Sequence, residues 1–141
     1  MSNKYSISVA VRVKPFLSGS KETKSTVDIA HKQIVNFDIG DTSRPLGSIG
    51  KRRKKNQHYA FDCVFSPEDS TKTVYDKMAK SAVIDALNGY NATIFAYGAT
   101  GSGKTHTMIG NSRGGPGIIV LAMYDIYTVI EKRFDECAFN V

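Results

Sequence analysis

Apolar residues alternate with polar residues near the start of the chain, and this period of two predicts a β-strand. Every second residue of Ile7–Val13 is apolar, and Pro15 ends the pattern. Two shorter strands are predicted at Thr26–Ile29 and Gln33–Phe37, with a turn at His31 between them. We therefore expect the chain to begin with β-structure.

The middle of the chain predicts a strand followed by a helix. Tyr59–Phe65 alternates again and places aromatic residues on one face. Cys63 lies on that face and is interpreted as a small buried residue rather than a reactive thiol. Ser70 is a suitable N-cap for a helix whose apolar residues recur at helical spacing up to Ala86, and Gly89 ends it. A strand, this helix and a further strand would form a right-handed βαβ unit.

A second long helix is predicted at Ile118–Arg133. The stretch VLAMYD within it imitates a strand that ends in a metal-binding aspartate, Asp125. No turn residue follows, apolar residues continue to Ile130, and Lys132 lies where a helix C-terminus favours a cation. We therefore interpret Asp125 as part of a helix.

A glycine-rich motif separates these two helices. Asn91–Tyr97 has the β-branched and aromatic content of a buried strand, and a helix is expected to begin near Gly103. Between them, the sequence fits G-x-x-x-x-G-K-[ST], the pattern of a phosphate-binding loop, or P-loop. The candidate phosphate-binding residues are Gly98, Ala99, Thr100, Gly101, Ser102, Gly103, Lys104 and Thr105. An ordinary glycine-rich turn before a helix is the alternative.

The residue types of this motif suit a nucleotide. Glycines allow positive φ angles, so the backbone can wrap around phosphate oxygens with its N–H groups pointing inward. The helix N-terminus adds unpaired N–H groups below the same phosphates. Lys104 supplies a compact positive charge, and the hydroxyl of Thr105 is a hard ligand suited to Mg²⁺. We therefore predict that nucleotide and magnesium bind together.

Composition limits the class of protein. The chain has 141 residues, of which 41% are hydrophobic, which allows one domain with an apolar core. It contains only two cysteines, Cys63 and Cys137, no charged and then apolar leader, and no apolar run near the ~20 residues that span a bilayer. These features lead us to expect a soluble protein in a reducing, intracellular setting that does not bind membranes.

The formal charge of +6 comes from the first half of the chain. Residues 39–57 form a polar insertion that contains five consecutive cations. They are Lys51, Arg52, Arg53, Lys54 and Lys55. The run could be a solvated loop, a contact for an acidic partner, or a nuclear-import or nucleic-acid patch. No aromatic residue lies within it on which bases could stack, so nucleic acid is the least favoured partner.

Four stretches together resemble the N-terminal part of a kinesin motor domain. They are VRVKP at Val11–Pro15, YAFDCVF at Tyr59–Phe65, LNGYNATIFAYG at Leu87–Gly98, and GATGSGKTHTM at Gly98–Met108. Ala99, the stretch PGIIVLAM and the basic insertion are similar to the kinesin-eight subfamily. The resemblance runs through residues 1–141, which would form one partial motor domain.

The resemblance implies an α/β fold of the P-loop NTPase type, with a central mixed sheet flanked by helices, of which this chain holds the N-terminal portion. It implies an ATPase stimulated by microtubules, which binds ATP and Mg²⁺ and couples hydrolysis to movement along microtubules. Tubulin would be the acidic partner of the basic run. A location in the cytoplasm on the microtubule cytoskeleton, with the nucleus or spindle also open, and oligomerisation through other regions are implied as well.

The family's adenine contacts map onto Arg12, Pro15 and His106, whose flat or apolar faces suit a base. Lys14 stands where the family usually has a second arginine, which leaves the contribution of that position open. The family's two switch segments do not occur after Thr105, so no catalytic residue is assigned. The chain alone is therefore expected to be inactive and to leave apolar surfaces uncovered. The alternative hypothesis is a truncated, non-catalytic fragment that binds nucleotide or tubulin.

Overall fold

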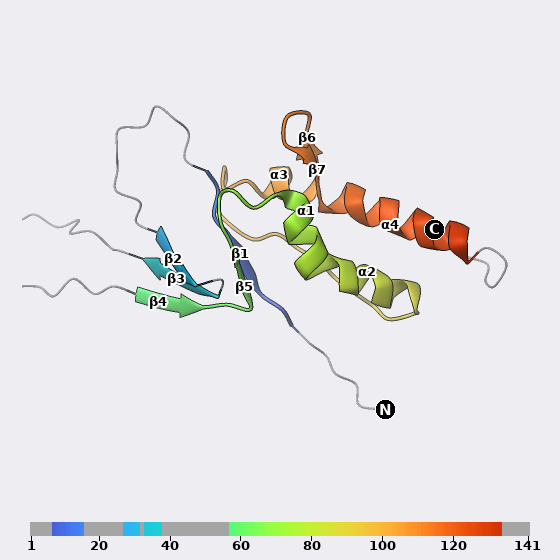
Figure 1. Cartoon of the computed structure of the whole chain (residues 1–141), viewed down its shortest axis with the longest axis horizontal. Helices are drawn as coiled ribbons and strands as arrows, with labels where there is room; N and C mark the ends of the chain where they lie inside the picture. Colours follow the sequence, from blue (N-terminus) through green and yellow to red (C-terminus); the bar gives the residue numbers. More distant parts are fainter. Residues whose placement is uncertain (1–6, 16–26, 32, 38–56, 134–141) are drawn as a thin grey trace, which may run out of the picture. The chain divides into compact units, whose positions relative to one another are not determined.

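The computed structural model describes residues 7–15, 27–31, 33–37 and 57–133. The chain divides into two compact units, Met1–Glu68 and Asp69–Val141, and each is described by itself (Figure 1). Some predictions concern residues outside the described ranges. They are the basic insertion up to residue 56 and Cys137.

The described residues of the first unit form two small sheets. Strands β1 (Ala10–Arg12) and β5 (Cys63–Phe65) form a parallel pair, in which Ala10 lies opposite Cys63. Strands β2 (Val27–His31), β3 (Ile34–Phe37) and β4 (Gln57–Ala60) form an antiparallel sheet in that order. The prediction for His31 was wrong, because this residue ends β2 and pairs with Ile34 after a register shift.

The single strand predicted at Tyr59–Phe65 is two strands in two different sheets. Asp62 separates them: its carboxylate accepts a hydrogen bond from the Val9 N–H at 2.7 Å, and its own N–H donates to the Val9 carbonyl at 3.0 Å. These bonds replace the ladder with β3, so the chain leaves one sheet and joins β1. Cys63 is half-buried, whereas Val64 and Phe65 are buried.

The first predicted strand is also shorter than its pattern suggested. The strand itself covers only Ala10–Arg12, with single backbone hydrogen bonds at Val9 and Val13 on either side, and Ile7 is 88% exposed. The alternation of apolar residues marks one possible buried face, but a β-strand also requires a hydrogen-bonding partner along its whole length.

The second unit begins with one continuous helical segment of three parts. They are α1 (Thr71–Val74), the π-helical turn η1 (Tyr75–Ala79) and α2 (Lys80–Leu87). The predicted ends are confirmed: the Thr73 N–H donates to the Ser70 hydroxyl at 3.1 Å, and Gly89 follows the helix with φ +91°. The π-turn is an addition that the apolar spacing did not predict.

The remaining helices follow the glycine-rich motif. The short helix α3 (Lys104–Met108) leads into a hairpin of β6 (Gly110–Asn111) and β7 (Gly115–Pro116), and then into α4 (Ile118–Lys132). Gly117 is the N-cap of α4 and lies where two backbone segments approach closely. A Cβ at this position would lie 2.3 Å from the Ile109 carbonyl carbon. Helix α4 runs beside α1, η1 and α2 (Figure 1).

The buried strand predicted at Asn91–Tyr97 is wrong as a description of this structure. The segment has no regular secondary structure, and no described strand pairs with it. All its residues but Ala96 are exposed, with Phe95 at 81% and Tyr97 at 96%. A buried parallel strand forms only where neighbouring strands supply ladder partners, so its sequence alone does not create it. The predicted βαβ unit is accordingly not formed by the described residues.

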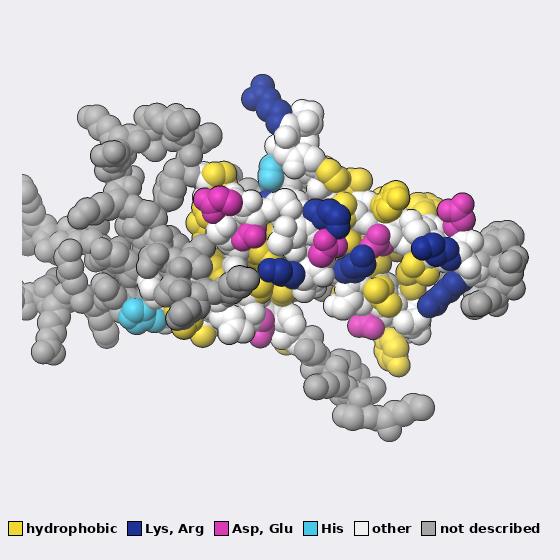
Figure 2. All heavy atoms as spheres, in the orientation of Figure 1, with side chains coloured by type: hydrophobic (Ala, Val, Ile, Leu, Met, Phe, Trp, Pro, Cys, Tyr) yellow, Lys and Arg dark blue, Asp and Glu magenta, His cyan; other side chains and the backbone are white. Residues whose placement is uncertain are grey.

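One face of α4 remains apolar and exposed, as the sequence led us to expect. It consists of Ile119, Val120, Met123, Tyr124 and Tyr127, each 45% exposed or more. Apolar side chains are visible at the surface along this helix (Figure 2). The opposite side of α4 packs against the first helical segment of the unit. None of the helices within the described ranges is long and apolar enough to cross a membrane.

Candidate phosphate-binding site

The glycine-rich loop adopts the backbone conformation that its sequence predicted. Gly101 and Gly103 have φ angles of +78° and +102°, which side chains with a Cβ rarely adopt. A Cβ at either position would meet no atom within 4 Å, so space lies open beside the loop. At Gly98, by contrast, a Cβ would lie 2.7 Å from the Ser102 hydroxyl oxygen. The glycines thus serve two purposes, backbone conformation and close approach.

Lys104 closes the loop upon itself. Its ammonium donates hydrogen bonds to the carbonyl oxygens of Gly98 and Ala99, both at 2.8 Å. An ammonium group has three donors, so these bonds leave one N–H that can turn to a further acceptor. Two carbonyl groups of the loop therefore hold the positive charge of Lys104 at the loop. The residues Gly98–Thr105 include no carboxylate that would repel an anion.

Helix α3 begins where the motif requires. Gly103 is its N-cap, and the first helical bond joins the Thr107 N–H to the Gly103 carbonyl at 3.0 Å. The N–H groups before Thr107 therefore have no partner within the helix. Together with Lys104 and the open space beside the glycines, these donors fit a bound phosphate group.

Thr105 is exposed at the start of α3, which suits its predicted role as a magnesium ligand. Within the described ranges, no group of three His, Cys, Asp or Glu side chains could hold a metal ion by itself. The other loop residues predicted to contact phosphate, Ala99, Thr100 and Ser102, are also exposed.

His106 lies under the β6–β7 hairpin. A Cβ at Gly114 would be 2.5 Å from its Nε2 atom, so glycine lets the hairpin turn approach the ring closely without displacing it. Asn111 shapes that turn, because its side-chain oxygen accepts from the N–H groups of Arg113 and Gly114. The imidazole is half-buried and is held at one edge by the hairpin.

The remaining predicted site residues belong to the first unit. Arg12 is the last residue of β1 and is half-buried, and Pro15 is exposed. The adenine contact predicted for Arg12, Pro15 and His106 stays a prediction. The basic run Lys51–Lys55 lies outside the described residues, so its predicted contact with a partner also stays a prediction.

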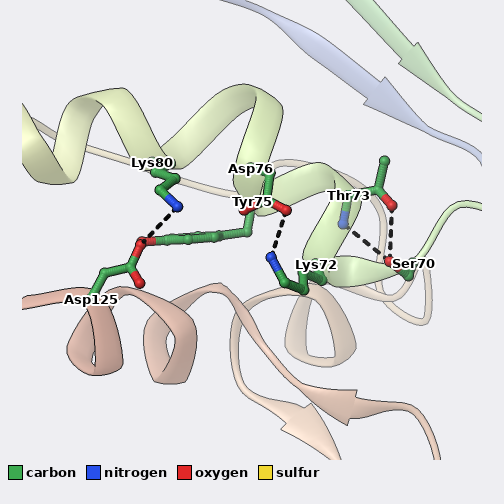
Figure 3. Close-up of polar contacts among 7 residues, drawn as sticks. All are labelled: Ser70, Lys72, Thr73, Tyr75, Asp76, Lys80 and Asp125. Carbon is green, nitrogen blue, oxygen red and sulfur yellow. Dashed lines mark hydrogen bonds and ion pairs between the residues drawn. The ribbon is translucent and has the colours of Figure 1, made fainter. Parts of the chain in front are cut away.

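One polar cluster was missed by reasoning from the sequence. Asp125 on α4 accepts a hydrogen bond from the Tyr75 hydroxyl at 2.8 Å, and the Lys80 ammonium lies 3.6 Å from the same carboxylate oxygen (Figure 3). Burial, and then the hydrogen bond to Asp125, raise the pKa of Tyr75 well above its usual value. The interpretation of Asp125 as a helical residue rather than a strand-end metal ligand is confirmed.

The conformation of the loop indicates the class of protein to which the chain belongs. A G-x-x-x-x-G-K-T loop with glycines at positive φ, which leads into a helix N-terminus beneath its lysine, is the phosphate-binding element of P-loop proteins.

Comparison with known proteins gives the family. The family model described as the kinesin motor domain matches residues 12–141. The chain belongs to the kinesin motor domain family. The resemblance noted from the sequence is thereby confirmed.

Individual relatives agree. Kinesin-like protein KIF18A of Mus musculus is 38% identical over 94% of this chain, and Kinesin-like protein KIN-8B of Arabidopsis thaliana is 37% identical over 96%. Kinesin-like protein KIN-7G of Oryza sativa subsp. japonica is 39% identical over 92%. The relatives thus include kinesin-8 members, as expected, alongside kinesin-7 members at similar identity. The chain spans only 16%, 16% and 13% of these three proteins, respectively.

Proposed function

We propose that this chain is the nucleotide-binding part of an ATP-dependent microtubule motor. Two facts support this proposal: the chain belongs to the kinesin motor domain family, and its loop presents Lys104 and a helix N-terminus beside open space. The observation that carries the nucleotide site is the backbone of Gly101 and Gly103, which takes positive φ angles beside open space.

Each loop residue has a proposed role. The backbone N–H groups of Gly98–Thr105 would surround the phosphates, and Lys104 would exchange its carbonyl partners for phosphate oxygens. Thr105 would contribute its hydroxyl to Mg²⁺, which supplies charge neutralisation at the phosphates when bound. Arg12, Pro15 and His106 would contact the adenine, as the resemblance implies, and ATP rather than GTP follows from the family.

The partner surface is proposed from sequence alone. Microtubules are the track implied by the family, and the cations at Lys51–Lys55 would attract the acidic surface of tubulin. An attraction of this kind raises the association rate and weakens as salt is added. The motor would therefore act on the microtubule cytoskeleton, and direction, cargo and assembly would depend on the rest of the protein.

The proposal is tested by nucleotide-dependent binding to microtubules in the full-length protein that contains this chain. Co-sedimentation is compared in the presence of Mg·ADP and of a non-hydrolysable ATP analogue. The unmodified protein should show different affinities in the two states, and Lys104→Ala should abolish that difference because the loop loses its charge. The matched control is Lys132→Ala, because Lys132 is an exposed lysine at the end of α4. Equal behaviour of Lys104→Ala and the unmodified protein would refute the proposal.

A further inference from the structure

The cluster around Asp125 joins two helices that lie on opposite sides of the phosphate-binding loop in the sequence. Tyr75 belongs to the helical segment before the loop, and Asp125 belongs to α4, which follows it. The Tyr75 side chain points toward α4, and its hydroxyl donates a hydrogen bond to a carboxylate oxygen of Asp125 (Figure 3). The Lys80 ammonium approaches the same carboxylate oxygen (Figure 3).

The contacts that Tyr75 and Lys80 make with Asp125 differ in strength. Tyr75 is only 2% exposed, so its hydrogen bond to a charged acceptor is partly shielded from water. The Lys80 and Asp125 side chains are 46% and 26% exposed and lie 3.6 Å apart, so solvent screens their attraction. The Tyr75 hydroxyl is therefore the principal partner of Asp125, and Lys80 is a secondary one.

The π-turn explains how one carboxylate reaches both residues. Tyr75 and Lys80 are five positions apart, and in a regular α-helix they would point about 140° away from each other. In η1 the Lys80 N–H donates to the Tyr75 carbonyl, and this i to i+5 bond brings the two residues onto one side of the helix. The π-turn thus creates the pair of donors that faces Asp125.

A second link joins the same helical segments further along. The Arg133 guanidinium donates to the Asn88 side-chain oxygen at 3.3 Å, just beyond the ends of α4 and α2. Residues 91–97, which lead from Asn88 to the loop, have no strand partner among the described residues. Within the second unit, two side-chain links therefore join the helical segment before the loop to the helix after it.

We propose that Asp125 is a positioning residue for the phosphate-binding loop: by holding Tyr75 and Lys80, it fixes the π-turned helix before the loop against the helix after it. This inference rests on the proposed nucleotide site. The arrangement would keep the distance between the two ends of the loop constant, so that its N–H groups stay aimed at one point. A loop whose ends can separate would bind phosphates less tightly.

The test uses the full-length protein that contains this chain and two readouts. The first is the Kd for a fluorescent ADP with Mg²⁺, and the second is hydrogen–deuterium exchange of the backbone amides in residues 98–105 without nucleotide. Asp125→Ala removes the acceptor, Asp125→Asn keeps an oxygen that can accept from Tyr75, and Tyr75→Phe removes only the donor. The matched control for charge is Asp85→Asn, because Asp85 carries an exposed carboxylate on α2.

Asp125→Ala should weaken ADP binding about tenfold and speed exchange of the loop amides, because a hydrogen bond to a charged group is lost. Asp125→Asn should retain most of the ADP affinity and most of the slow exchange of the loop amides seen in the unmodified protein. The double variant of Tyr75→Phe and Asp125→Ala should be no weaker than Asp125→Ala alone, since both changes remove the same bond. Asp85→Asn should behave like the unmodified protein.

The inference is overturned if Asp125→Ala lowers the melting temperature but leaves ADP affinity and loop exchange unchanged, which would mark a purely structural bond. Equal losses for Asp125→Asn and Asp125→Ala would also contradict it, since the bond to Tyr75 would then not matter. Failure of the unmodified protein to bind ADP would refute the proposed function instead. In that case the exchange of the loop amides would still decide the role of Asp125.

Discussion

The conformation of Gly103 makes a quantitative prediction about the loop. Gly103 is the N-cap of α3 with φ +102° and ψ +14°, a left-handed conformation. An alanine there would meet no protein atom within 4 Å, so in the absence of nucleotide its cost would come from the backbone alone. Left-handed backbone costs a residue with a Cβ about 1–2 kcal/mol. Gly103→Ala should therefore destabilise the loop by this amount in the full-length protein.

Gly103→Asn is the matched variant, because asparagine tolerates left-handed conformations better than other residues with a Cβ. It should cost less than Gly103→Ala in two assays, thermal unfolding and the Kd for Mg·ADP. The alanine variant should weaken ADP binding by about 5- to 30-fold if the whole cost falls on the conformation that binds. Alanine and asparagine variants that both match the unmodified protein would refute the argument that positive φ at Gly103 shapes the site.

Three further predictions concern the rest of the second unit. Gly117→Ala should destabilise the protein by about 1–3 kcal/mol or more, because its Cβ would lie 2.3 Å from a backbone atom of Ile109; an unchanged melting temperature would contradict the close approach. Ser70→Ala should cost about 1 kcal/mol in urea unfolding by removing the bond to the Thr73 N–H, and Ser70→Asp should recover most of it. Burial and the bond to Asp125 raise the pKa of Tyr75 above its unfolded value of about 10, so the stability from neutral Tyr75 is present below pH 10 and lost as the pH rises further. Melting temperatures between pH 9 and 11 should accordingly fall more steeply in the unmodified protein than in Tyr75→Phe, and parallel curves would contradict this.

Features governed by short-range signals were predictable from the sequence. Ser70 and Gly89 marked the two ends of the first helical segment, and the structure ends it there. The helix at Ile118–Lys132 and the start of α3 at Gly103 followed from local spacing and glycine placement in the same way. The backbone conformation of the glycine-rich loop belongs to this group, because it is set by the loop's own glycines.

Features that depend on distant partners were not predictable. Asn91–Tyr97 has the composition of a strand, yet a strand exists only where another strand pairs with it. Asp62 splits Tyr59–Phe65 through bonds to Val9, a residue far away in the sequence. The π-turn, from which Tyr75 contacts Asp125 on α4, likewise has no signal in the spacing of apolar residues.

The most direct test of the account is the rate of ATP hydrolysis by the full-length protein that contains this chain, measured with and without microtubules. The unmodified protein and the control Lys132→Ala should both hydrolyse ATP faster when microtubules are added. Lys104→Ala should lose this stimulated hydrolysis, because its ammonium is the charge that the loop holds for the phosphates. Stimulated hydrolysis that persists in Lys104→Ala would contradict the assignment of this loop as the nucleotide site of a motor.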